Sequence, residues 1–131
     1  MLTRRIDAGQ QSRELLICGK FVIESSSLSF REKGVLIIGS GNMVHNLRLV
    51  SWQHLDKVYG YDWALEASDK MRNFILDNRH KELIQYTSQG KAFAMAIPSP
   101  EHYLPLLYSL SLQDKDDRIT LFNDKPVAGA L

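Results

Sequence analysis

Two histidines in this chain of 131 residues lie where imidazoles often meet a metal ion or a substrate. His102 lies in the stretch PSPEHYLPL, where Ser99 and Pro100 predict a helix start that puts the imidazole in the first turn. The positive end of a helix dipole disfavours an imidazolium ion. We therefore expect His102 to stay neutral and able to bind a metal.

The second histidine, His45, lies in the stretch GSGNMVHNL, directly after the apolar run 35–38. That run shows no alternation, which predicts a strand buried on both faces, and open α/β sheets place their ligand crevices at such strand ends. Asn42 and Asn46 offer amides that can orient the ring or a substrate hydroxyl. A capping or purely structural role is the alternative for both histidines, and it is the expected role of His54 and His80.

The glycines before His45 also permit a different interpretation, a phosphate-binding loop at 39–41. Val44 occupies the place of the third glycine of the dinucleotide motif, and no phosphate-loop lysine follows. Nucleotide binding is therefore the weakest of the hypotheses.

Composition narrows the class of partner. Lysine and arginine number 16 against 15 acidic residues, and the charges are scattered, so we expect neither a nucleic acid nor a membrane as partner. Cys18 is the single cysteine, which excludes an internal disulfide and indicates a reducing compartment, the cytoplasm. A small molecule is the expected ligand.

Periodicity and turn signals predict an α/β fold, with a partial sheet of buried parallel strands flanked by helices. We expect one incomplete domain over 1–131. Helices are predicted at 12–23, 28–33, 62–77, 81–86 and from 99 onward, strands at 35–38, 118–122 and from 127 onward, and 92–97 is left open between strand and irregular core.

Two stretches, REKGVLIIGSGNMVHNLRLVSW (31–52) and PSPEHYLPLLYSLSL (98–112), resemble the C-terminal half of the class III extradiol ring-cleaving dioxygenases, in particular the DOPA 4,5-dioxygenase extradiol family. The stretches DWALEASDKMRNFI (62–75) and ITLFNDKPVAGAL (119–131) resemble it too, whereas 1–30 match poorly. The resemblance implies a metal site with Fe(II), or Zn(II) in its place, and a catechol and O2 as substrates.

The resemblance also implies roles for individual residues. His102 matches a metal ligand, and His45 matches a residue that is either a ligand or the acid/base for the catechol proton. Asn42 and Tyr103 would be neighbours on the substrate side.

The chain departs from the family in one important respect. Members are about twice as long, and the Gly-His-Gly-Ser-Pro and Ser-Ala-His-Trp motifs that carry their N-terminal metal ligands do not occur here. We therefore expect a truncated, frameshifted or late-started dioxygenase that is inactive alone and forms a homo-oligomer. The alternative is a non-catalytic binding or oligomerising module that retains the fold. The two hypotheses make different predictions for His45 and His102, whose rings should approach one point only if a metal site is retained.

Overall fold

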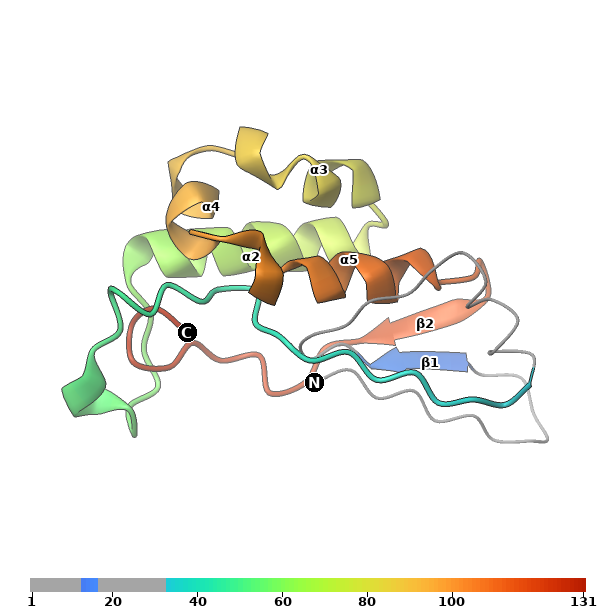
Figure 1. Ribbon diagram of the computed structural model, residues 1–131, viewed down its shortest axis with the longest axis horizontal. Coiled ribbons are helices and arrows are strands. Elements are labelled where there is room, and N and C mark those ends of the chain that lie inside the picture. Colours follow the sequence, from blue (N-terminus) through green and yellow to red (C-terminus); the bar gives the residue numbers. More distant parts are fainter. Residues whose placement is uncertain (1–12, 17–32) are drawn as a thin grey trace.

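A computed structural model describes residues 13–16, for which it gives secondary structure, and residues 33–131. Helices form one compact group, and a pair of short strands lies beside it (Figure 1). Among the described residues, no helix combines the length and the apolar composition needed to cross a bilayer. The elements are β1 (Arg13–Leu16), η2 (Trp52–His54), α2 (Asp62–Leu76), α3 (His80–Ile84), η3 (Tyr86–Ser88), α4 (Lys91–Ala96), η4 (Pro100–His102), α5 (Leu104–Ser111) and β2 (Asp117–Thr120).

Helix α2 is the centre of the core and confirms the helix predicted at 62–77. Its buried stripe includes Ala67, Met71 and Ile75, none of which exposes any measurable surface. The stripe packs against α4 and α3, and not against the sheet that the predicted α/β fold would place beside its helices. Asp62 is the first helical residue, and Tyr61 is the extended residue before the helix.

The two segments after α3 complete this core. Residues 92–97, which the sequence left open, lie largely in α4, whose Phe93 and Ala96 are fully buried against α2. The helix predicted from 99 onward is broken into two parts, the turn η4 and the helix α5, with Tyr103 between them. Pro105 lies in the first turn of α5, where its missing N–H leaves no helical hydrogen bond unmade.

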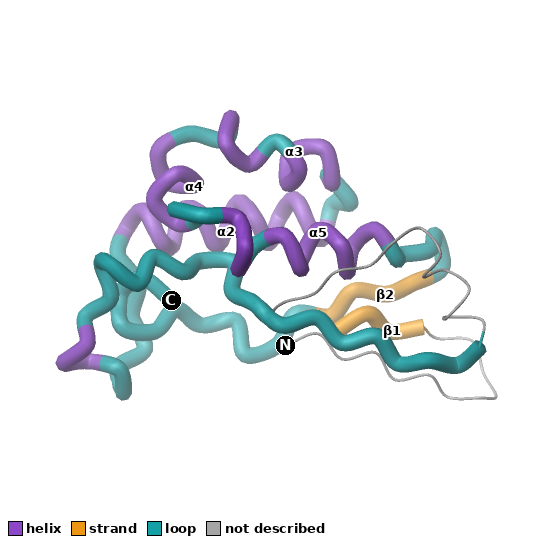
Figure 2. Tube along the Cα trace, viewed as in Figure 1, coloured by secondary structure: helices purple, strands orange, loops and turns teal. Residues whose placement is uncertain are grey.

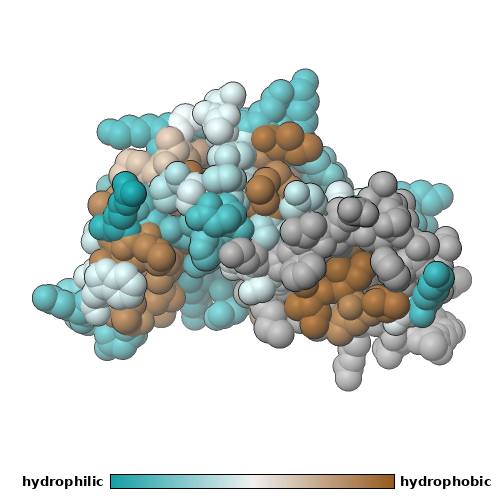
Figure 3. Space-filling view, viewed as in Figure 1, coloured by the Kyte–Doolittle hydropathy of each residue, from teal (hydrophilic) through white to brown (hydrophobic). Residues whose placement is uncertain are grey.

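The predicted core strand at 35–38 is wrong. The segment has no strand structure, and Val35, Leu36 and Ile38 are 41–45% exposed. It runs as loop along one edge of the molecule, where apolar side chains gather on the surface (Figures 2 and 3). A strand is buried on both faces only when helices cover both sides, and the described residues provide no such cover here.

Strands β1 and β2 pair in parallel, with Arg13 opposite Asp117. β2 lies largely within the strand predicted at 118–122. β1 contradicts the first part of the helix predicted at 12–23. The rest of that predicted helix, and residues 28–32 of the next one, lie outside the described residues. Helices and one strand pair are compatible with the α/β class. The predicted sheet of buried strands is not found in the described part of the chain.

The last residues are interlaced with the loop before α2. In place of the strand predicted from 127, a tight turn makes two isolated bridges, Val58 to Val127 and Gly60 to Gly129. Gly129 has a φ of 84°, and a Cβ at this position would lie 2.5 Å from the ring of Tyr61. Glycine is needed here both for its backbone conformation and for the close approach of the ring.

Substitution of Met71 tests the α2 core. Met71→Ala should lower the free energy of unfolding by about 2–5 kcal/mol, because it leaves a cavity among side chains that cannot fully close around it. Leu76→Ala, at a position on the same helix that is 49% exposed, is the matched control and should cost far less. Urea unfolding monitored by circular dichroism measures both; equal losses would contradict the packing.

Tyr103 joins the start of α5 to α3. The side chain is fully buried, its hydroxyl donates to the backbone oxygen of Leu83 over 2.9 Å, and its ring lies 5.0 Å from that of Tyr86. Burial raises the pKa of Tyr103 far above that of an exposed tyrosine, so the hydroxyl stays a donor.

Tyr103→Phe should therefore destabilise the fold by about 1–3 kcal/mol, because the carbonyl of Leu83 loses its buried partner. Tyr108→Phe, at a half-buried position in α5, is the control and should cost less. Urea unfolding again gives the comparison. An unchanged midpoint for Tyr103→Phe would show that its hydroxyl does not stabilise the fold.

Candidate functional site

The candidate site is built where the loop 42–46 docks against the segment 95–102. The amide of Asn42 donates to the oxygen of His102 over 3.0 Å, and the amide of His45 donates to the oxygen of Ala96 over 3.0 Å. The side-chain amide of Asn46 donates to the oxygen of Met95 over 2.7 Å. These bonds fix the backbone on both sides of His45.

The ring of His45 is buried between two carbonyl groups. Nε2 lies 2.8 Å from the oxygen of Ser99 and Nδ1 lies 3.1 Å from the oxygen of Asn42. Burial lowers the pKa of His45 despite these two acceptors, so the neutral ring is favoured. A neutral imidazole has one N–H, so only one of the two contacts is a donated hydrogen bond, and the other nitrogen presents its lone pair.

His102 lies beside His45, with ring centroids 5.1 Å apart and planes inclined by 34°. It ends the three-residue turn η4 instead of opening a long helix, so the expected helix dipole is absent and the turn itself positions the ring. Ser99 does not cap this turn; its hydroxyl donates to Glu101 Oε1 over 2.6 Å, which lowers the pKa of Glu101. Within the described residues, no hydrogen bond to the ring of His102 is formed.

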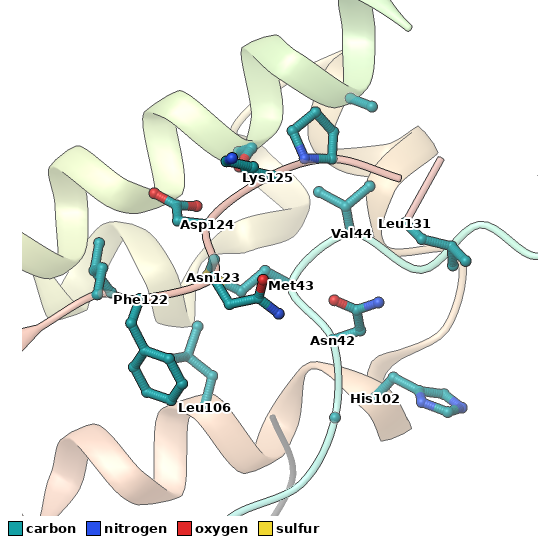
Figure 4. A pocket seen from close by; sticks show the side chains of 15 residues that line it. Asn42, Met43, Val44, His102, Leu106, Phe122, Asn123, Asp124, Lys125 and Leu131 are labelled. Atoms are coloured by element: carbon teal, nitrogen blue, oxygen red, sulfur yellow. The ribbon is translucent and has the colours of Figure 1, made fainter. Parts of the chain in front are cut away.

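A pocket of about 100 Å³ opens next to His102 (Figure 4). Asn42, the expected neighbour of the substrate, is among the lining residues, whereas His45 is not. Tyr103 is not among the lining residues and is part of the core, so its predicted contact with substrate stays a prediction without structural support.

The other two histidines lie elsewhere. Nδ1 of His54 is 2.8 Å from the hydroxyl of Ser51, and His80 begins α3. Among residues 33–131, which include all four histidines of the chain, no three metal-binding side chains form a group.

A metal ion fits this arrangement in part. Two imidazoles on one ion, with metal–nitrogen bonds of about 2.1 Å, have ring centroids roughly 4.5–5.5 Å apart. The observed 5.1 Å between His45 and His102 agrees with that spacing. Both nitrogens of His45 face carbonyl oxygens, however, so its ring has to turn before it can bind the ion. The described residues thus supply two imidazoles of suitable spacing and no third ligand.

One wall of the pocket comes from residues 123–126, which lie between the strands predicted at 118–122 and from 127 onward. Asn123 and Asp124 both line the pocket, and Asp124 accepts a 2.5 Å hydrogen bond from Arg72 of α2. A polar turn directly after a predicted strand was the available signal, but such turns are common on any surface.

Comparison with known proteins identifies relatives for most of the chain. It is 36% identical over 104 residues to "4,5-DOPA dioxygenase extradiol" of Escherichia coli (strain K12), a match that covers 77% of this chain and 36% of that protein. It is 33% identical over 79 residues to the protein of the same name from Portulaca grandiflora, covering 56% and 27% of the two chains. No family model matches, and no solved structure gives a significant match.

The chain therefore spans about a third of the length of the curated relatives that it matches. The matches bear out the resemblance carried by the motifs around His45 and His102. This protein is thus related to the DOPA extradiol dioxygenase family.

Proposed function

We propose that this chain carries part of the metal and substrate site of an extradiol dioxygenase that opens the ring of a catechol. The observation that supports this most directly is the approach of His45 and His102 beside a pocket, at a centroid distance of 5.1 Å. The relatives named for extradiol dioxygenase activity supply the reaction class. Catechol and O2 are then the substrates of the whole enzyme.

In this proposal, His45 and His102 bind Fe(II), and Zn(II) can occupy the same position. Non-haem Fe(II) with open coordination positions can bind O2 and an organic substrate together. Because burial lowers the pKa of His45, its ring is neutral near pH 7 and can bind the ion or accept a proton from a catechol hydroxyl.

Two imidazoles alone hold such an ion weakly. The other two histidines, His54 and His80, do not join the pair, and within the described residues no acidic or cysteine side chain does so either. We therefore expect little or no ring cleavage by the isolated chain, and full activity only where further ligands are supplied.

Metal titration tests the two histidines. Calorimetry under anaerobic conditions should detect weak binding of Fe(II) and Zn(II), reduced about tenfold or more by His45→Ala and by His102→Ala, because each removes one of two ligands. His54→Ala is the control and should bind as the unmodified chain does, since the ring of His54 is directed to Ser51.

Two results would contradict the proposal: an affinity indifferent to both substitutions, or binding lost only in the control. Robust oxygen uptake by the isolated chain with Fe(II) and a catechol would instead contradict the expected inactivity alone.

A second candidate function, an oligomerising module without catalysis, is favoured by the apolar segment 35–38. Val35, Leu36 and Ile38 lie within four residues of one another and are 41–45% exposed, and an apolar surface patch of this kind often marks an interaction site. Pairing of this segment with another chain would cover it.

Leu36→Asp should therefore shift the chain from dimers or larger species toward monomers in light scattering, because a charge opposes apolar association. Leu76→Asp, at a similarly exposed position on α2, should leave the distribution unchanged. If the unmodified chain is monomeric at every concentration, the role as an oligomerising module is excluded.

A further inference from the structure

The pocket beside His102 contains two amide side chains that face each other. Asn42 and Asn123 are 81 positions apart in sequence, yet both line the pocket, and their amide groups are turned toward one another (Figure 4). Asn42 is fixed next to His102, because its backbone amide donates to the oxygen of that residue over 3.0 Å. The metal proposal makes no use of Asn123.

The position of Asn123 is strongly determined by its backbone. Its φ of 52° is left-handed, a conformation that asparagine tolerates better than most side chains. The next residue, Asp124, is held to α2 by the side chain of Arg72, which also bonds Asp69 over 2.6 Å. Asn123 therefore projects from a wall that is tied to the longest helix.

The chemistry of the lining indicates a neutral aromatic ligand with polar groups on one edge. Each amide offers a donor and an acceptor, which matches a hydroxyl group in both capacities. Met43, Leu106 and Phe122 supply apolar surface for a ring. Asp124 and Lys125 both line the pocket and carry opposite charges, so the lining has no excess of either sign that would select an anion or a cation.

We infer that Asn42 and Asn123 form an amide clamp, the pair of side chains that hydrogen-bonds the two adjacent hydroxyls of a catechol and keeps that edge beside His102. Asn123 is then a positioning residue that determines specificity for vicinal hydroxyls. The inference deepens the proposed function, from which it takes the substrate class, but it makes a separate statement about where the ligand is held.

The test uses the metal-free chain in the presence of a chelator, so that it does not depend on metal binding. Titration with catechol, followed by two-dimensional NMR of the side-chain amides, should give saturable shifts at Asn42 and Asn123. Asn123→Gly keeps the left-handed backbone and removes the amide, and should weaken catechol binding about fivefold or more, as expected for the loss of one hydrogen bond. Resorcinol, the isomer with separated hydroxyls, should bind the unmodified chain less tightly than catechol.

Asn78→Gly is the matched control. Asn78 has a similar φ of 55°, but its side chain accepts a hydrogen bond from Gln113 and lies outside the pocket lining, so the affinity should not change. If Asn123→Gly fails to fold, Asn123→Asp replaces the donor by a charge and should weaken binding likewise.

The outcomes separate this inference from the proposed function. Equal affinity of Asn123→Gly and the unmodified chain, equal binding of resorcinol, shifts confined to other residues, or no binding of catechol at all would overturn the amide clamp. Catechol shifts at the two amides together with a negative metal titration would support the clamp and contradict the dioxygenase assignment. A positive metal titration without those shifts would do the reverse.

Discussion

The docking of loop 42–46 onto the segment 95–102 is the constraint on which the site depends. Three backbone and side-chain amides, of Asn42, His45 and Asn46, donate to carbonyls of this segment, and the carbonyls of Asn42 and Ser99 enclose the ring of His45. The loop has no regular structure of its own, so these bonds replace the ladder that a strand would provide. Two of the accepting carbonyls, those of Met95 and Ala96, belong to the last residues of helix α4.

The same arrangement explains why a site exists without a complete sheet. Helix α2 is covered by α3 and α4, and its opposite side meets the turn 123–126 through the pairing of Arg72 with Asp124. The pocket is the space left between that turn and loop 42–46, with His102 at its rim. Its two walls thus come from opposite ends of the described chain, and the core of α2 holds them at a fixed separation.

Part of this arrangement could be predicted from sequence. The helix at 62–77 was predictable because its apolar residues repeat at helical spacing, and the motifs around His45 and His102 were specific enough to indicate the family. The buried strand predicted at 35–38 was wrong, because the composition of this run suits such a strand but its burial depends on other parts of the fold. Asn123 could not be predicted as a pocket residue, because turn signals in a sequence locate a loop but do not indicate which other part of the fold the loop contacts. The proximity of His45 and His102 followed from the family resemblance, not from spacing along the chain.

The exposed run at 35–38 also bears on the fate of the chain in a cell. Four consecutive valine, leucine and isoleucine residues, three of them more than 40% exposed, form the kind of segment that seeds intermolecular β-structure. Chaperones and proteases survey surfaces of this kind, so the abundance of the free chain would follow how quickly this segment is covered, more than the stability of the helical core. The amount of the chain in a cell therefore depends on whether another chain covers residues 35–38.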